Sequence, residues 1–419
     1  MNRRELLKKA GLAMAGVPFW MGILPENLQA KIPSGIKITG LKTFMVGNYV
    51  FLKIYTNQGV TGLGEGTIHN QAQTVEAAIR DREHILIGRD PTNIEFLWQA
   101  MFRWPRYRDG KVPNAAISAI EIALWDILGK VLEVPIYKCL GGAARDRIRL
   151  YCHNHGRTPE AMAESVRKSV EEDGFTIVRT GLEWSTPIIK RPWNLKLAVS
   201  LIEAMREAAG DDVDIIDDAH GLMTPVMVVE YANAIEQYRL MFIEDPILAE
   251  DIAGLEWIGN HTNVPLGVGE NNHTRFGYFR DMIFKHLVSY VRPDVIHAGG
   301  ISECKKIGAM AEANFIDVAL HVHSSPVSDL ASAHIAATTP NCVCQEYAGH
   351  QQSQWIKDLF NGDDISITDG YAALPQKPGL GCDLNEEVAA KHPYVGRKMP
   401  QVTDVFTGAV YEDGTPKDH

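Results

Sequence analysis

The strongest constraint on the fold is a repeated alternation of short apolar runs and longer amphipathic stretches between residues 147 and 369. Each gap between consecutive runs is long enough for one helix, and eight strands with intervening helices indicate a closed parallel barrel. A doubly wound open sheet is the alternative, but no glycine-rich phosphate loop follows the first run. The eight runs cover residues 148–152, 175–179, 213–218, 240–245, 265–270, 288–294, 317–321 and 342–346.

A second pattern precedes these runs and predicts a separate unit. Residues 36–56 read as β structure, Asn57–Gly59 as a turn and residues 60–66 as a returning strand, which together signal a hairpin. Apolar residues at helical spacing then predict helices over residues 71–102 and 115–132. The second helix is apolar on most faces, so we expect it to be buried.

The two patterns together predict an α/β chain. The expected fold is a modified (β/α) TIM-like barrel with an α+β N-terminal capping domain, which the C-terminal segment completes. The expected units are an export signal over residues 1–30, the capping domain over 31–146, the barrel over 147–369 and a segment packing on the cap over 370–419.

The first 30 residues have the layout of an export signal. Arg3 and Arg4 precede a leucine pair and a lysine pair, and a Gly/Ala-rich apolar stretch follows, as in twin-arginine signals. Gly11, Gly16 and Pro18 make this stretch a poor permanent membrane span. We therefore expect export to the periplasm. The alternative is an amphipathic N-terminal helix of a cytoplasmic protein.

The net charge and the cysteine pattern indicate which partners and crosslinks to expect. The net charge is −11 and no basic run occurs beyond the first nine residues, so we expect no nucleic-acid partner. The acidity does not exclude an anionic substrate, because a bound cation can reverse the local field. The six cysteines are scattered without a Cys-x-x-Cys pair, and we expect most of them in the core.

Three carboxylates stand at the same position of the repeat. Asp218, Glu244 and Glu270 end the third, fourth and fifth apolar runs and are spaced 26 residues apart. In a parallel barrel the strand ends converge at one face, where three carboxylates would repel one another unless a cation lay between them. An all-oxygen set suits Mg²⁺ better than zinc. Any one of these acids alone would be read as a helix cap or a solvated side chain.

The next three runs end in residues suited to proton transfer. Asp294, His321 and Glu346 end the sixth, seventh and eighth runs, and an aspartate beside a histidine can orient it as a base. A structural histidine is the alternative for His321, and His323 is its nearest rival for the role of base. His220 follows Asp218 by two residues, which on a strand would place both side chains on one face. We interpret His220 as a general acid, or otherwise as a hydrogen-bond donor behind the metal ligands.

This set suits removal of a proton from the carbon beside a carboxylate. The resulting enediolate concentrates negative charge, and a divalent cation on the carboxylate supplies several kcal/mol of stabilisation. Loss of a β-hydroxyl then requires an acid, and His220 could provide it. The products would be a 2-keto-3-deoxy acid and water.

At these residues the chain resembles the enolase superfamily, and more narrowly the acid-sugar dehydratases of galactonate and mannonate dehydratase type. The resemblance covers roughly residues 36–395. The motifs that carry it are Gly62-Leu63-Gly64-Glu65 and residues 123–130 in the cap, and IIDDAHG, FIEDP, PLGVGE, RPDVIHAGGISE, ALHVHSSPVSDLA, QEY and PGLGCDL in the remainder of the chain.

The resemblance implies a role for each of these residues. It implies Asp218, Glu244 and Glu270 as ligands of one Mg²⁺, the Asp294–His321 pair as the base, and His220 as the acid. It also implies that Glu346 holds the substrate or the developing oxyanion, and that the chain assembles as a homo-oligomer. We assign Arg179, His155 and His350 to binding of a small sugar acid.

Two other activities remain compatible with the sequence. Epimerisation or another lyase reaction could use His220 and His321 as opposed acid and base. However, the second strand carries Arg179-Thr180-Gly181 where mandelate racemase and muconate cycloisomerase types carry Lys-x-Lys, which disfavours a two-base racemase that uses that lysine. The third possibility is a non-catalytic binder of sugar acids, against which the intact ligand and base set argues.

Overall fold

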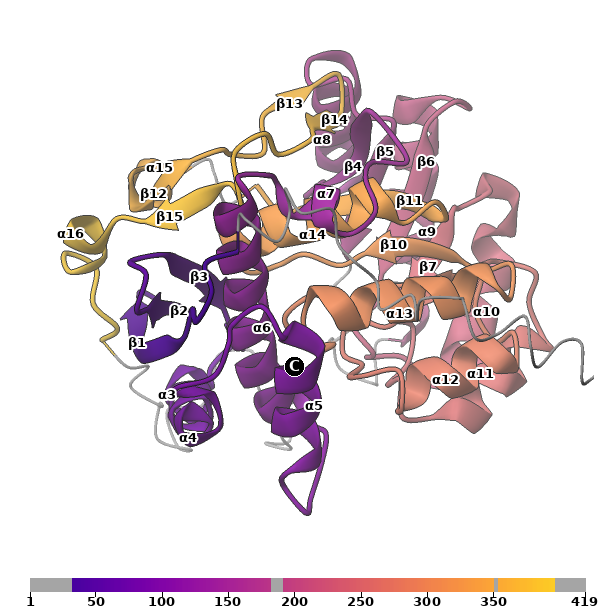
Figure 1. Cartoon of the computed structure of the whole chain (residues 1–419). Helices are drawn as coiled ribbons and strands as arrows, with labels where there is room; N and C mark the ends of the chain where they lie inside the picture. Colours follow the sequence, from indigo (N-terminus) through magenta and orange to yellow (C-terminus); the bar gives the residue numbers. More distant parts are fainter. Residues whose placement is uncertain (1–31, 182–190, 350–352, 396–419) are drawn as a thin grey trace, which may run out of the picture.

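The computed structural model describes residues 32–181, 191–349 and 353–395, which form a capping domain beside a parallel barrel (Figure 1). The expected export signal lies outside these residues. Within the described part of the chain, no helix combines the length and the apolar character needed to cross a membrane. All six cysteines are unpaired and five of them are buried. The predicted fold class is confirmed.

The capping domain opens with a three-stranded antiparallel sheet. Its strands β1 (Ile38–Val46), β2 (Tyr49–Thr56) and β3 (Thr61–Glu65) pair in the order β1-β2-β3. The predicted hairpin across Asn57–Gly59 is confirmed by the pairing of β2 with β3. Residues 36–56 are not one strand, as the sequence suggested, because a turn at Gly47, whose φ is 55°, divides them into β1 and β2.

The helices of the cap are shorter than predicted in one region and longer in another. The single helix expected over residues 71–102 is wrong: Gly88 adopts a φ of 79° and Pro91 follows, so the chain breaks into separate helices. The buried helix expected over 115–132 begins four residues earlier, at Lys111. The helices are α3 (Ala72–Arg80), α4 (Glu83–Leu86), α5 (Ile94–Arg103), α6 (Lys111–Leu132) and α7 (Ile136–Cys139).

Helix α6 packs directly on the backbone of β3. A Cβ atom on Gly62 or Gly64 would lie 2.0 or 1.9 Å from a backbone carbonyl oxygen of α6, so only glycine permits this approach. Glu65, the last residue of β3, then reaches the barrel, where its Oε2 accepts hydrogen bonds from the Ser325 hydroxyl at 2.6 Å and the Ser328 N–H at 3.2 Å. The Gly-Leu-Gly-Glu motif therefore joins the sheet to α6 and the cap to the barrel.

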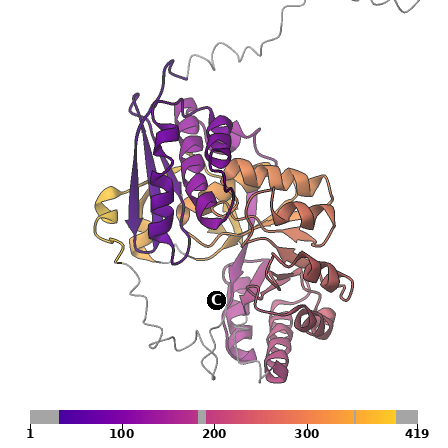
Figure 2. The same cartoon turned by 90° about the horizontal axis from the view of Figure 1, so that it is seen from below.

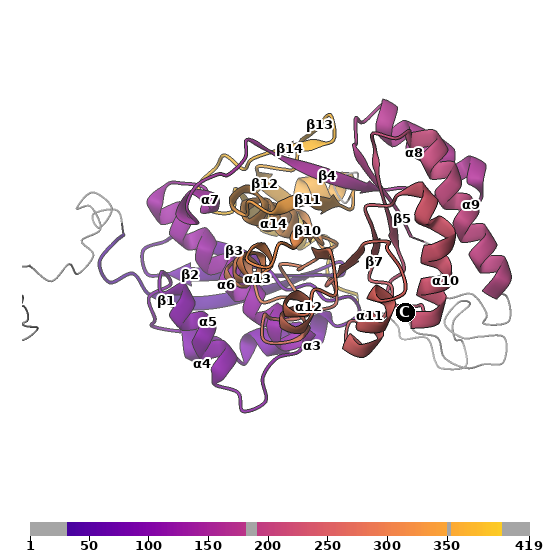
Figure 3. The same cartoon turned by 90° about the vertical axis from the view of Figure 1, so that its right-hand side faces the viewer.

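Eight parallel strands close into the predicted barrel, because the last strand pairs with the first. Helices alternate with the strands along the chain and cover the outside of the barrel (Figure 3). The strands are β4 (Arg147–His153), β5 (Ile177–Gly181), β6 (Asp214–Asp218), β7 (Phe242–Glu244), β8 (Leu266–Val268), β9 (Tyr290–Val291), β10 (Asp317–Leu320) and β11 (Cys342–Tyr347). The helices are α8 (Pro159–Glu171), α9 (Arg191–Ala209), α10 (Pro225–Ile235), η3 (Glu236–Tyr238), α11 (Ile252–Gly259), α12 (Tyr278–Phe284), α13 (Ile301–Glu312) and α14 (Pro326–Thr338).

The barrel interior is packed rather than open. A cluster of fully buried side chains fills it, separate from the larger core between the sheets and the helices. Its members are Tyr151, Ile177, Ile216, Phe242, Ala319 and Cys344. With the interior filled in this way, we look for a ligand site at the C-terminal ends of the strands.

The C-terminal segment contacts both units. Its strands β13 (Ile367–Thr368) and β14 (Tyr371–Ala373) form a hairpin that extends the barrel sheet beside β4. The boundary that we expected between residues 369 and 370 falls in the turn of this hairpin. The remaining elements, which lie beside the strands of the cap (Figure 2), are α15 (Gln354–Leu359), β12 (Phe360–Gly362), β15 (Cys382–Leu384) and α16 (Glu386–Ala389).

Candidate active site

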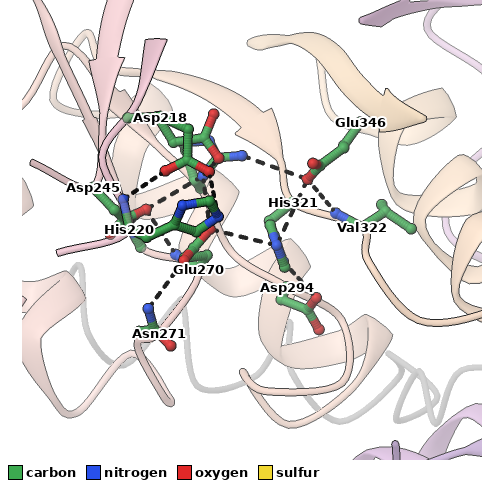
Figure 4. A network of polar contacts seen from close by, with 12 residues as sticks. Asp218, His220, Asp245, Glu270, Asn271, Asp294, His321, Val322 and Glu346 are labelled. Atoms are coloured by element: carbon green, nitrogen blue, oxygen red, sulfur yellow. Dashed lines mark hydrogen bonds and ion pairs between the residues drawn. The ribbon is translucent and has the colours of Figure 1, made fainter. Parts of the chain in front are cut away.

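The three predicted metal ligands lie together at the C-terminal ends of neighbouring strands. Asp218 and Glu244 are paired across β6 and β7, and Glu270 follows β8 by two residues. Each residue offers one carboxylate oxygen, and these oxygens lie within 4.8 Å of one another. Figure 4 labels two of the three, Asp218 and Glu270. Asp218 and Glu244 are fully buried and Glu270 is 8% exposed. The structure therefore brings together the three acids that the 26-residue spacing singled out.

The chemistry of these carboxylates fits a hard divalent cation. Asp218 Oδ2 and both carboxylate oxygens of Glu244 are buried and accept no hydrogen bond of normal geometry from the described residues, and only the ion pairs with Arg179 and Arg292 and the nearby His220 face them. Buried carboxylate oxygens without donors are costly unless positive charge faces them. An oxygen-only donor set of this kind suits Mg²⁺, which these three residues would hold.

The Asp294–His321 pair forms an oriented dyad beside the carboxylates. His321 Nδ1 lies 2.7 Å from Asp294 Oδ2, and the other oxygen of Asp294 accepts the N–H groups of Ile296 and His297 at 2.6 and 3.0 Å. The remaining nitrogen, His321 Nε2, lies 3.5 Å from Glu270 Oε2 and 3.7 Å from Glu346 Oε2. His321 therefore presents Nε2 to the centre of the site.

The surrounding charges strongly favour the protonated form of this histidine. Burial alone would lower the pKa of His321, but the charge of Glu346, the hydrogen bond with Asp294 and the charge of Glu270 raise the pKa to about 10. Burial likewise opposes ionisation of Asp294, yet the charge of His297 and the hydrogen bond with His321 hold its pKa at about 2. Positive charge added at the neighbouring carboxylates would lower the pKa of His321 and make it available as a base.

His220 lies beside Asp218, to the left of the dyad in Figure 4. Its N–H donates to Asp218 Oδ1 at 2.9 Å, and its Nε2 lies 2.8 Å from Asp218 Oδ2. The expectation that the strand continues through His220 is wrong, because β6 ends at Asp218 and His220 adopts a φ of 50°. The turn still directs the imidazole to the site and leaves its side chain 49% exposed, as a residue that exchanges protons with a ligand requires.

Arg292 is a buried cation that the sequence analysis did not single out. Its Nη1 lies 2.6 Å from Glu244 Oε1 and 3.6 Å from Glu270 Oε2, and its Nη2 contacts the Tyr151 hydroxyl. Burial opposes its charge, but Glu244 and the neighbouring acids hold its pKa well above the usual value. The only sequence signal was its place two residues before Asp294, in the Arg-Pro-Asp motif.

Glu346 is held by two donors at the far side of the dyad. His153 Nε2 lies 2.6 Å from Glu346 Oε1, and the Val322 N–H donates to Glu346 Oε2 at 3.0 Å. The charges of His321 and His153 outweigh the effect of burial and keep the pKa of Glu346 well below its usual value. His153, to which the sequence analysis gave no role, therefore keeps Glu346 ionised.

The three predicted substrate-binding residues differ in where they lie. Arg179 reaches the carboxylates and is 7% exposed. His155 is exposed at the rim, where its ring centroid lies 6.3 Å from that of His153. His350 lies outside the described residues.

Two further contacts connect the metal-ligand loop to its surroundings. Asn271 Nδ2 donates to Glu270 Oε1 at 3.0 Å, and Lys111 Nζ, at the start of α6 in the cap, donates to Asn271 Oδ1 at 2.5 Å. On the barrel side, His297 Nδ1 lies 2.6 Å from the Glu270 carbonyl oxygen. The cap therefore helps to position Glu270 through Asn271.

Comparisons with known proteins agree with this geometry. The family model for the mandelate racemase / muconate lactonizing enzyme N-terminal domain matches residues 23–141, and the enolase C-terminal domain-like model matches residues 161–388. Two D-galactonate dehydratases are similar to this chain in sequence. The protein from Pectobacterium atrosepticum is 35% identical and that from Ralstonia pickettii is 36% identical, and each match covers 84% of this chain and 93% of the relative.

Solved structures show the same architecture over most of the chain. An enolase from Pantoea ananatis with bound D-gluconate and Mg is 31% identical, with a TM-score of 0.79, and the match covers 86% of this chain and 95% of that one. An enolase superfamily member from Salmonella Typhimurium is 29% identical, with a TM-score of 0.81, over 85% and 98% of the two chains.

Proposed function

Because the chain belongs to the mandelate racemase / muconate lactonizing enzyme family of the enolase superfamily, we propose that it is a Mg²⁺-dependent dehydratase of sugar acids. The proposal is that it converts an acid bearing both an α-hydroxyl and a β-hydroxyl group into a 2-keto-3-deoxy acid. One observation carries it: the oriented base His321 and the exposed imidazole of His220 flank the same three carboxylates. Such an arrangement can remove a proton on one side of a bound acid and deliver one on the other.

The roles of the residues follow from their contacts. Bound Mg²⁺ would be held by Asp218, Glu244 and Glu270, and would supply positive charge against the enediolate. His321 Nε2 takes the proton from the α-carbon, and Asp294 holds the opposite nitrogen as its hydrogen-bond partner. The electrons of the C–H bond move onto the carboxylate and give the enediolate. As they return to form the C=C bond to the β-carbon, the C–O bond to the β-hydroxyl breaks, and His220 donates the proton with which the hydroxyl leaves as water. The enol then tautomerises to the 2-keto acid.

The substrate class is supported by three similar proteins. The proteins from Pectobacterium and Ralstonia are named for D-galactonate, and the solved Pantoea structure holds D-gluconate. Galactonate and gluconate are both aldonic acids, with a carboxylate, an α-hydrogen, an α-hydroxyl and a β-hydroxyl. We therefore propose an aldonic acid, with uronic acids as the second class.

A screen of aldonic and uronic acids in the presence of Mg²⁺ tests the proposal. The expected result is a 2-keto-3-deoxy product from at least one acid, with none after removal of Mg²⁺ by a chelator. Exchange of the α-proton with solvent D₂O in the absence of any keto product would instead favour epimerisation. Binding of an acid with neither exchange nor product would favour a sugar-acid binding protein.

Two properties of the whole chain are proposals of a different kind. We propose export through the twin-arginine-like residues 1–30, and assembly as a homo-oligomer. Cell fractionation with an antibody against the chain tests export, and recovery only with the cytoplasmic fraction would contradict it. Light scattering of the purified protein tests assembly, and a mass near the 46.5 kDa of one chain would contradict it.

A further inference from the structure

The side chain of Arg179 enters the group of carboxylates that we assign to the metal. Arg179 lies near the end of β5, and its Nη2 forms an ion pair with Asp218 Oδ2. Its Nε lies 3.8 Å from Glu244 Oε2, and its Nη2 lies 3.4 Å from His220 Nε2. The guanidinium group is thus between the acids on β6 and β7 and the proposed general acid.

The oxygens that Arg179 faces are those that a metal ion would need. Asp218 Oδ2 and Glu244 Oε2 belong to the buried oxygens that accept no hydrogen bond of normal geometry from the described residues. A guanidinium group and a divalent cation cannot occupy the same side of these oxygens at once. Binding of the metal therefore requires Arg179 to give up its ion pairs with Asp218 and Glu244.

Arg179 and Arg292 differ in how firmly they are held. Arg292 is completely buried and bridges Glu244, Asp245 and the Tyr151 hydroxyl, so several partners keep it in place. Arg179 keeps a small exposed surface of 7%, whereas Arg292 has none. Of the two cations, Arg179 is the one that can leave the carboxylates without breaking a larger network.

We propose that Arg179 is an internal counter-ion of the metal-free site, which Mg²⁺ displaces and which is then free to pair with the carboxylate of the substrate. Arg292 offsets part of the repulsion among the three buried carboxylates through Glu244 and Glu270, whereas the arginine that pairs with Asp218 is Arg179. Arg179 supplies positive charge there until the metal arrives, so Mg²⁺ must compete with it. This inference rests on the proposed metal site.

The decisive experiment is calorimetric titration of the metal-free full chain with Mg²⁺ at constant ionic strength. Arg179→Met removes the competing cation, and we expect it to bind Mg²⁺ about tenfold more tightly than the unchanged protein, a factor typical of coupling between two ligands. The matched control is Arg149→Met. Arg149 also pairs with an aspartate on β6, Asp214 at 2.8 Å, but at the opposite end of the strand, and its loss should leave the Mg²⁺ affinity unchanged.

The outcomes separate this inference from the proposed function. If the unchanged protein binds no Mg²⁺, the metal site itself fails. If the unchanged protein binds Mg²⁺ and Arg179→Met binds it equally or more weakly, the metal site stands and the counter-ion role is overturned. Should Arg179→Met not fold, Arg179→Lys gives the answer, because it keeps the charge but cannot span both acids. Tighter Mg²⁺ binding by that variant supports the inference, and equal or weaker binding contradicts it.

The second half of the inference concerns the substrate. With the acid that the screen identifies, Arg179→Met should raise KM about tenfold at saturating Mg²⁺, a loss within the range of one charged hydrogen-bonding pair. Tighter metal binding together with weaker substrate binding is the expected signature. A purely structural role for Arg179 would weaken both, and an unchanged KM would remove the pairing with the substrate.

Discussion

His321 Nδ1 lies 2.7 Å from Asp294 Oδ2, and this contact decides which nitrogen of the imidazole faces the proposed substrate. Asp294→Asn would keep the shape but could donate a proton to Nδ1, turning the ring into the wrong tautomer. We expect kcat to fall at least about 100-fold, with KM changed little. Steady-state kinetics with the identified acid measure this, and a kcat near that of the unchanged protein would remove the dyad from the mechanism.

Glu244→Gln tests the metal site. Glu244 is fully buried and its carboxylate faces Arg179 and Arg292, so a neutral amide should weaken Mg²⁺ binding severely and abolish turnover while the barrel stays folded. Calorimetry and circular dichroism measure the two effects. Glu256→Gln, at a half-exposed surface ion pair, serves as the control and should change neither. Retained turnover in Glu244→Gln would exclude Glu244 as a ligand.

His220→Asn separates proton removal from proton delivery. Because His220 contacts Asp218 whereas His321 Nε2 faces Glu270 and Glu346, loss of His220 should stop elimination of the β-hydroxyl but leave part of the α-proton exchange. Mass spectrometry of the acid after incubation in D₂O measures exchange, and assay of the 2-keto product measures elimination. Equal loss of both would show that the two histidines do not divide the roles of acid and base.

Gly64→Ala tests the contact between the cap sheet and α6. The added Cβ would lie 1.9 Å from the Ala119 carbonyl oxygen, so the strand or the helix must shift. We expect a loss of about 1–3 kcal/mol in the free energy of unfolding, or more. Gly40→Ala on β1, where no atom lies within 4 Å of the added Cβ, should stay within about 0.5 kcal/mol. Urea denaturation measures the free energy of unfolding of both variants. Equal values for Gly64→Ala and Gly40→Ala would contradict the close packing of β3 on α6.

The buried side chain of His334 should make the folded protein less stable at acid pH. It accepts the Tyr137 N–H at Nδ1, and its Nε2 lies 3.1 Å from the Leu380 carbonyl oxygen, so the buried ring is neutral. Burial lowers its pKa from 6.5 to about 4. Between pH 4 and pH 6.5 the unfolded chain binds more protons at His334 than the folded chain does. The contribution of His334 to the free energy of unfolding is therefore fully present above pH 6.5 and is lost as the pH falls towards 4.

The full contribution of His334 is about 3 kcal/mol, from the size of this pKa shift. His334→Gln can make the same two hydrogen bonds but does not titrate. Urea denaturation from pH 4 to 7 should therefore show a weaker pH dependence in the variant than in the unchanged protein. Identical slopes would mean that His334 is not the group responsible.

The order of the barrel strands and the position of the three acids could be predicted from the sequence. Both depend on a local repeat: each apolar run forms a strand, and the residue that ends it lies at the same face of the barrel as its equivalents. For this reason Asp218, Glu244 and Glu270 were found without any knowledge of contacts. Local patterns failed where single residues changed the backbone, as at Gly88 in the cap and at the left-handed turn of His220.

Only the tertiary structure revealed how the charges of the site are balanced. His153 and Arg179 lie on β4 and β5, and Arg292 directly follows β9. Nothing in their local sequence shows that they face Glu346, Asp218 and Glu244. Their partners depend on the closure of the barrel, because β11 must pair with β4 before His153 can reach Glu346. A strand's end is decided by its own residues, whereas the electric field at that end is the sum of side chains that folding brings from the whole ring.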